Sequence, residues 1–211
     1  MRCFSYRRKK IGRFGTMRNR LVLFVLCLTF ASVSCQQYGD YMPKPRGYHR
    51  INFPDKLYHQ VERGGCPFDF EIPVYSQLHD DQSRNAEPCW KNLDFPQFNA
   101  RLHISYSKIE KSAPLDELTE DARTFVFKHT TKATAIDQKD ISISEHQVYG
   151  LEYGIKGNTA SNYQFYVSDS TTNYLRGALY FNEKPNLDSI QPVLDYLTED
   201  IRHLIRTIRW K

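Results

Sequence analysis

The sequence predicts an α+β fold in which two helices pack on an antiparallel β-sheet, with the elements in the order β–α–β–β–β–α. Three observations predict it. Several short segments alternate apolar and polar residues, which is the period of a half-buried strand. Two longer segments repeat apolar residues every three or four positions, which is the period of an amphipathic helix. The connections between the later strands are short and polar, which favours antiparallel neighbours.

An extended N-terminal part that contains two cysteines precedes this region. Within it, Phe68, Phe70 and Ile72 alternate with acidic residues and predict a strand that ends at Pro73. The polar residues 79–88 are typical of a loop. A clearer strand follows over residues 102–107, where Leu102, Ile104 and Tyr106 alternate with polar residues.

The first helix is predicted after Ser112, which is a suitable N-cap residue. Pro114 is tolerated in a first helical turn, and Asp116 and Glu117 lie where the helix dipole favours anions. Apolar residues at helical spacing run from Leu115 to Val126, so the helix is expected to end between residues 128 and 132.

Three strands are predicted next, over residues 149–155, 163–167 and 175–181, joined by a turn at 156–158 and a loop at 168–173. The chain then ends in a long amphipathic helix. Its apolar residues recur at spacings of three and four from Leu187 to Ile208. A membrane-surface helix is the alternative. Acids on its polar side argue for packing on the sheet instead: Asp188, Asp195, Glu199 and Asp200.

The N-terminus has the organisation of an export signal over residues 1–34: a basic start, an apolar stretch from Leu21 to Ala31, and small residues before Cys35. A cysteine in that position receives a lipid in bacterial lipoproteins. An uncleaved membrane anchor and a cleaved signal with an unmodified cysteine remain alternatives, and Met17 is an alternative start. We expect a lipidated tether over residues 35–47 and one globular domain over residues 48–211.

The net charge of +5 for the whole chain comes from the signal. Residues 1–34 hold eight basic and no acidic side chains, so the remainder has 21 basic and 24 acidic residues and a net charge of −3. No basic stripe is left that would indicate a nucleic-acid partner.

Two cysteines, Cys66 and Cys89, lie outside the signal and the lipid-attachment position. In an oxidising compartment they most simply pair. Such a bridge closes a loop of 22 intervening residues. In the chain-entropy model, closing a loop of this length stabilises the folded state by about 3 kcal/mol. A redox site or a metal site is the alternative, but the chain has neither a Cys-x-x-Cys pair nor histidines at zinc-site spacing.

Candidate catalytic residues do not form a recognisable pattern. There is no Gly-x-Ser-x-Gly elbow and no glycine-rich phosphate loop. We interpret His103 as a polar strand residue, His129 as a helix-end cation, and His146 as isolated. The acids Asp80, Asp81, Asp137 and Asp140 lack a calcium-loop pattern and are interpreted as solvated. The sequence therefore predicts no enzyme, no cofactor, no metal and no small-molecule ligand.

Tyrosines are frequent on the predicted strands, where they serve either the core or an exposed binding face. The register of the strands decides between the two uses. The tyrosines on the predicted strands are Tyr149, Tyr153, Tyr163, Tyr166, Tyr174 and Tyr180.

Several segments together resemble a known family. They are the lipidated N-terminus, Pro43-Lys44-Pro45-Arg46-Gly47-Tyr48-His49-Arg50-Ile51, Cys66-Pro67-Phe68-Asp69-Phe70, Cys89-Trp90, Asp94-Phe95-Pro96-Gln97-Phe98-Asn99, Lys128-His129-Thr130-Thr131-Lys132-Ala133 and the strand–strand–helix ending. The set resembles GldD, the gliding-motility-associated lipoproteins of Bacteroidetes. The predicted sheet with two helices also looks somewhat like the Mog1/PsbP-type α/β fold, by analogy alone.

The resemblance to GldD implies a cell-envelope lipoprotein needed for gliding and for the associated type IX protein secretion, with an assembly role rather than a reaction. It implies lipid attachment at Cys35, membrane association through that lipid, and partners among envelope motility and secretion proteins. Because no dense acidic run follows Cys35, we expect the domain to face the periplasm. A periplasmic carbohydrate-binding or hydrolytic domain is the alternative, and a disulfide-dependent redox protein is a third hypothesis.

Overall fold

A computed structural model of the chain describes Val22 and residues 50–61 and 65–211. Its contacts divide the chain into two units, Met1–Gly47 and Tyr48–Lys211, and all that follows concerns the second unit. The predicted signal, the tether and the lipid-attachment residue Cys35 lie outside the described residues.

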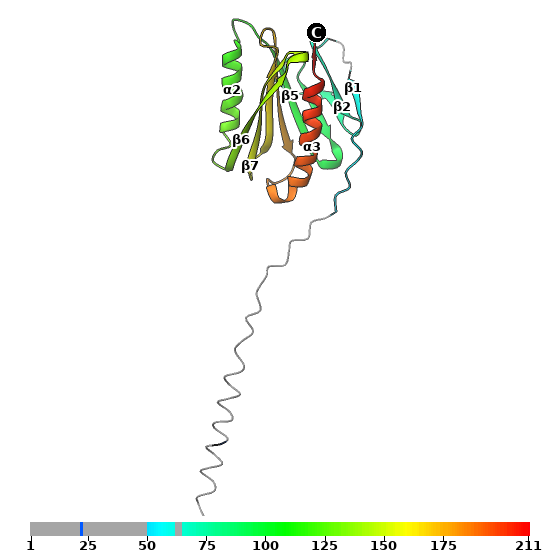
Figure 1. Ribbon diagram of the computed structural model, residues 1–211, viewed down its shortest axis with the longest axis vertical. Coiled ribbons are helices and arrows are strands. Elements are labelled where there is room, and N and C mark those ends of the chain that lie inside the picture. Colours follow the sequence, from blue (N-terminus) through cyan, green and yellow to red (C-terminus); the bar gives the residue numbers. More distant parts are fainter. Residues whose placement is uncertain (1–21, 23–49, 62–64) are drawn as a thin grey trace, which may run out of the picture. The chain divides into compact units, whose positions relative to one another are not determined.

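A seven-stranded antiparallel sheet is the centre of the fold (Figure 1). Its strands lie in the order β3-β4-β5-β9-β8-β7-β6. Every neighbouring pair is antiparallel. The strands span β3 Gln77–Asp80, β4 Lys91–Phe95, β5 Ala100–Lys108, β6 Ala133–Ile143, β7 Val148–Gly157, β8 Ser161–Ser168 and β9 Asn173–Phe181. One-turn 3₁₀ helices, η1 Pro96–Phe98 and η2 Ser144–His146, connect β4 to β5 and β6 to β7.

Two helices, α2 (Leu115–Phe127) and α3 (Leu187–Thr207), pack on opposite faces of this sheet. On β7, Tyr153 and Ile155 pack against Val126 of α2. Glu152, the residue directly before Tyr153, instead accepts a hydrogen bond from Arg202 of α3. Because successive residues of a strand point to opposite faces, the two helices lie on opposite sides.

A small second sheet covers the α3 side as well. It has the order β1-β2-β10, with β1 Tyr58–Val61, β2 Phe68–Pro73 and β10 Arg209–Trp210. Phe68, Phe70 and Ile72 of β2 are buried in the main core, together with Leu197 and Ile201 of α3. The Cys66–Cys89 disulfide, with 5.5 Å between its Cα atoms, joins the start of β2 to the start of β4.

The structure confirms the α+β class, the two helices and the predicted strands around residues 68–73, 102–107, 149–155, 163–167 and 175–181. It differs in detail. Pro114 is the N-cap residue of α2, and no side chain caps that helix, so the expectation for Ser112 is wrong. Five further strands are present: β1, β3, β4, β6 and β10. The predicted loop 79–88 therefore begins within β3.

Candidate functional site

On the face of the sheet that carries α2, no helix of residues 50–61 and 65–211 covers strands β3, β4 and β5 (Figure 1). Neighbouring strands place Asp94 opposite Arg101 and Arg101 opposite Tyr180. Two residues further along β5, on the same face, His103 lies opposite Asn92 of β4. Arg101 and His103 are exposed, and Asp94 and Tyr180 are half-buried. We call this set, Asn92, Asp94, Arg101, His103 and Tyr180, the open polar face.

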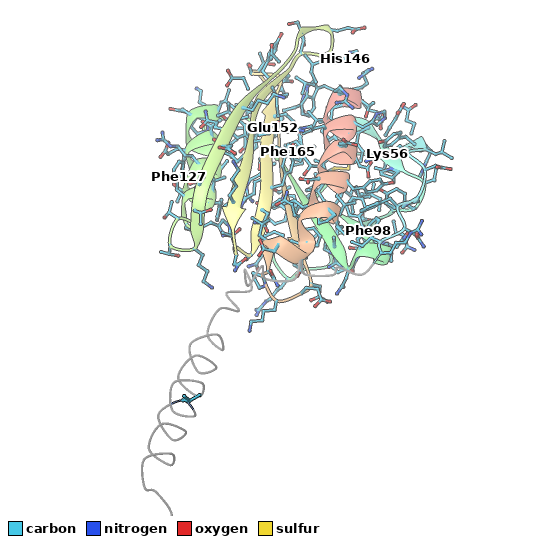
Figure 2. The ribbon with its side chains drawn as sticks, turned by 60° about the horizontal axis from the view of Figure 1, so that its bottom comes forward. Lys56, Phe98, Phe127, His146, Glu152 and Phe165 are labelled. Atoms are coloured by element: carbon cyan, nitrogen blue, oxygen red, sulfur yellow. A yellow bond between two sulfur atoms is a disulfide. The ribbon has the colours of Figure 1, made fainter. Side chains whose placement is uncertain are left out.

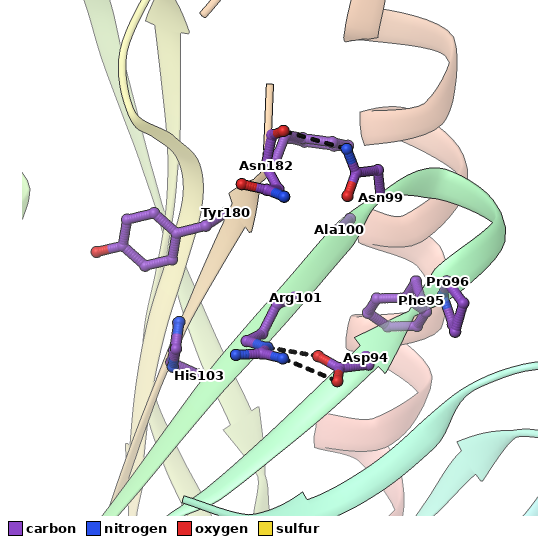
Figure 3. A pocket seen from close by; sticks show the side chains of 10 residues that line it. Asp94, Phe95, Pro96, Asn99, Ala100, Arg101, His103, Tyr180 and Asn182 are labelled. Carbon is purple, nitrogen blue, oxygen red and sulfur yellow. Dashed lines mark hydrogen bonds and ion pairs between the residues drawn. The ribbon is translucent and has the colours of Figure 1, made fainter. Parts of the chain in front are cut away.

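An ion pair fills the middle of the open polar face (Figure 3). The Arg101 Nε donates to Asp94 Oδ1 at 2.5 Å, and its Nη2 donates to Asp94 Oδ2 at 2.9 Å. This fork geometry is the strong bidentate form of an arginine–carboxylate pair. The bond to Asp94 raises the pKa of Arg101 above its ordinary value. The two side chains therefore neutralise each other and present a fixed, planar polar surface.

His103 lies beside this pair, with its ring edge-on to the ring of Tyr180 at 5.4 Å between centroids. Although His103 is exposed, partial desolvation of its ring by surrounding atoms lowers its pKa, and the nearby Arg101 charge lowers it further. The imidazole is accordingly neutral at pH 7. Hydrogen bonds within the described residues do not join it to a serine or cysteine side chain.

Two shallow depressions of about 550 Å³ and 600 Å³ adjoin the open polar face and share Asp94, Arg101 and His103. Asn99 lines the first and Asp81 the second. The backbone N–H of Ser83 lowers the pKa of Asp81, which stays ionised. The buried Oδ1 of Asn92 has no hydrogen-bond partner in the described parts of the chain.

A second groove, of about 610 Å³, runs between α3 and strands β6 and β7. The carboxylate of Glu152 lies in it (Figure 2) and accepts bonds from Arg202 at 2.7 and 3.0 Å and from Tyr163 at 2.6 Å. Lys139 lies 3.8 Å away. Burial opposes ionisation of Glu152, but the Arg202 and Tyr163 bonds outweigh it and lower its pKa. A carboxylate held in this way is a structural clamp rather than a general acid.

The other predicted residues are scattered. His129 follows the end of α2, His146 lies in η2, and Asp137 pairs with Lys156 at 2.7 Å on neighbouring strands. In residues 50–61 and 65–211, no three His, Cys, Asp or Glu side chains gather as they would around a metal ion. Nor does a helix there have the length and apolarity needed to cross a membrane.

The tyrosines of the strands differ in burial. Tyr153, Tyr163 and Tyr174 are buried, whereas Tyr149 is 37% exposed. Sequence reasoning missed Arg101, Asp94 and Glu152. One signal was available for Glu152, which is a charged residue flanked by Leu151 and Tyr153 between two glycines, Gly150 and Gly154.

Comparison with known proteins gives one family. The sequence model described as "Gliding motility lipoprotein GldD" matches residues 38–210. No curated protein matches the chain. The solution structure of PsbP from the cyanobacterium Synechocystis sp. PCC 6803 has a TM-score of 0.43 and 11% identity, covering 77% of this chain and 97% of that one.

Proposed function

The chain belongs to the GldD family of gliding motility lipoproteins, and from this premise we propose that it is a non-enzymatic assembly or interaction factor of the cell envelope. In this proposal it serves gliding and the associated type IX protein secretion. A lipid on Cys35 holds the domain at a membrane, on the periplasmic side. The protein partners are other components of the motility and secretion machinery.

The open polar face is the observation that carries the proposal. It presents arginine and tyrosine, which are enriched in protein interfaces, on the rigid frame of β4, β5 and β9. Its charges are already paired within the face. A partner would therefore not have to neutralise a buried charge when it covers Asp94 and Arg101.

The lipid tether favours partners close to the membrane. Between Cys35 and the first described strand residue, Tyr58, lie 22 residues. Because the membrane surface and the domain then share a small volume, binding of a membrane-held partner gains from a high effective concentration. Weak contacts at the open polar face are sufficient in that setting.

A crosslinking experiment in the native host tests the proposal. Wild-type protein, Cys35→Ala and the double variant His103→Ala/Tyr180→Ala are crosslinked in cells, recovered from membranes and analysed by mass spectrometry. The double variant removes two rings from the open polar face and leaves the Asp94–Arg101 pair intact. A matched double variant, His146→Ala/Tyr149→Ala, truncates the same residue types at the β6–β7 end.

We expect an acylated N-terminal peptide in all but Cys35→Ala, and motility or secretion proteins crosslinked to wild type and to the matched control. Both test variants should lose these partners while the double variant unfolds at the wild-type temperature. Full motility and an unchanged crosslinking pattern in His103→Ala/Tyr180→Ala would remove the open polar face from the proposal. Acylated wild-type protein without any protein partner would overturn the assembly role.

Carbohydrate binding is the second candidate, favoured by one observation. The rings of Tyr180 and His103 border a depression that also contains the amides of Asn99 and Asn182. Aromatic rings beside amide groups can hold a sugar. Calorimetric titration with soluble cell-wall glycan fragments tests this candidate. Binding that is lost in His103→Ala/Tyr180→Ala would support it, and absence of heat with wild type would dismiss it.

A further inference from the structure

Strand β6 is a long edge strand of the seven-stranded sheet (Figure 1). Its 11 residues, Ala133–Ile143, pair with β7 on one side. No strand of the described chain pairs with the other side. A strand of that length extends about 36 Å. Open edges present unpaired N–H and C=O groups, and proteins usually keep them short or covered.

The sequence of β6 is complementary to itself. If β6 lies antiparallel to a copy of itself with its middle residue, Gln138, facing the Gln138 of the copy, each Asp137 faces a Lys139. Two opposite-charge pairs form by symmetry. In the same register Ala135 faces Ile141, a small residue against a large one. Opposite charges on directly facing residues contribute about 0.2–1 kcal/mol per pair.

Repulsion between like charges disfavours the two neighbouring registers. A two-fold axis perpendicular to the sheet keeps each face on its own side, so facing residues must belong to the same face. A shift of the axis to residue 139 would put Lys139 against Lys139. A shift to residue 137 would put Asp137 against Asp137. Like charges directly opposite are destabilising. The register centred on Gln138 is the one that the charges select among the three.

The side-chain directions agree with this register. Lys139 lies 3.8 Å from Glu152, and Asp137 lies 2.7 Å from Lys156, both on the side of the sheet that carries α3. Pairing of two copies would therefore extend these pairs into a row of alternating signs that crosses the two-fold axis. The row would run from Lys156 to Asp137, and then to Lys139 and Glu152 of the second copy. The bulge between Ala133 and Ala135 lies at the end of the paired span.

We infer that β6 is a homodimer interface, at which the outer edge of β6 pairs antiparallel with β6 of a second copy in the register centred on Gln138. The two seven-stranded sheets then form one continuous sheet, in which the β6 edge of each copy is paired. The contact is isologous and therefore stops at two copies. This inference uses the edge of the sheet and is independent of the open polar face.

Crosslinking at the two-fold axis tests it directly. Gln138→Cys is made in the full chain, in host membranes, and the thiols are oxidised. In the proposed register the two Cα atoms at this position are about 4.5–5.5 Å apart, within disulfide reach. Ser142→Cys, on the same face and also exposed, is the matched control. Its two copies would be about 27 Å apart.

We expect a disulfide-linked dimer from Gln138→Cys and at least tenfold less from Ser142→Cys. Asp137→Lys or Lys139→Asp, each added to Gln138→Cys, should reduce the dimer several-fold, and both together should restore it. These side chains are exposed, at 64% and 72% for Asp137 and Lys139, so the variants keep the fold. Equal crosslinking of both cysteine variants, no dimer from Gln138→Cys, or no recovery in the charge-reversed double variant would overturn the inference.

Discussion

The ammonium group of Lys56 donates a 2.8 Å hydrogen bond to Asp200, an acid on α3 that is only 1% exposed. The Tyr58 hydroxyl donates to the same carboxylate oxygen at 2.7 Å, and Tyr75 donates to the other oxygen. Lys56 also lies 3.7 Å from the ring centroid of Tyr196. A buried carboxylate thus holds the segment that enters the domain against the C-terminal helix, more than 140 residues away in sequence.

Replacement of Asp200 by alanine should destabilise the domain by about 3 kcal/mol, because it leaves a cation and two hydroxyl groups without their shared acceptor. Glu199→Ala is the matched control. Glu199 is also an acid near Lys56, at 3.5 Å, but its side chain is 71% exposed, so its loss should cost less than about 0.5 kcal/mol. Urea unfolding measures both. Similar losses in the two variants would show that the Asp200 network does not hold the segment.

Asp200 also shows what the sequence could and could not predict. The apolar spacing of residues 187–208 predicted α3 nearly to the residue. The same pattern put Asp200 on the polar side of the helix but did not predict its burial, because Lys56, Tyr58 and Tyr75 cover it there and donate to its carboxylate. Helical periodicity reports the sheet-facing side of a helix. It holds no information about a segment 140 residues away that covers another side.

Strand β6 was missed for a physical reason. Strand periodicity requires one buried and one exposed face. In β6 all but four residues are exposed, and these four, Ala133, Ile136, Ile141 and Ile143, are only half-buried. The sequence of β6 therefore shows no clear alternation, and its charged residues indicated a loop. The open polar face was missed because Asp94, Arg101 and Tyr180 come from three strands, and only the register brings them together.

Removal of the Cys66–Cys89 disulfide should lower the free energy of unfolding by about 3 kcal/mol, the value expected for a loop of this length. The bridge acts as one unit, so Cys66→Ser, Cys89→Ser and the double variant should lose similar amounts. Chemical denaturation of the three variants checks this. A double variant as stable as wild type would mean that β2 and β4 are held together without the bridge.

Gly177 is predicted to be intolerant of a side chain. A Cβ atom at this position of β9 would lie 2.1 Å from the ring of Phe165 on the neighbouring strand. Gly177→Ala should cost about 1–3 kcal/mol, because the buried ring must move within a packed core. Gly154→Ala is the control, since a Cβ there meets nothing within 4 Å. It should be neutral or slightly stabilising, as alanine restricts the unfolded chain more than glycine does.

Thermal and urea unfolding of both glycine variants checks this prediction. A double-mutant cycle with Phe165→Leu separates the clash from the general cost of a core change. The smaller side chain should recover part of the loss caused by Gly177→Ala, which gives a coupling energy of about 1 kcal/mol. Additive losses in the cycle would contradict the proposed contact between residue 177 and the ring.

Glu152 should make the stability of the domain depend on pH in the acidic range. Its pKa is lowered in the folded state by Arg202 and Tyr163, in spite of burial. The folded state therefore binds fewer protons than the unfolded state does. The contribution of Glu152 is complete above the ordinary glutamate pKa and is lost as pH falls through the lowered folded-state pKa.

Glu152→Gln should remove that part of the pH dependence and cost about 2 kcal/mol at pH 7, where two charge-assisted bonds to Arg202 are weakened. Urea unfolding at intervals from pH 7 to pH 3 measures both effects. The difference between wild type and Glu152→Gln should shrink toward low pH, because protonation turns the wild-type carboxylate into a neutral group like the amide. Asp137→Asn removes a charge from an exposed ion pair. Its free energy of unfolding should therefore depend on pH in the same way as that of wild type. A constant difference between wild type and Glu152→Gln across this range would show that size and shape, rather than charge, determine the role of Glu152.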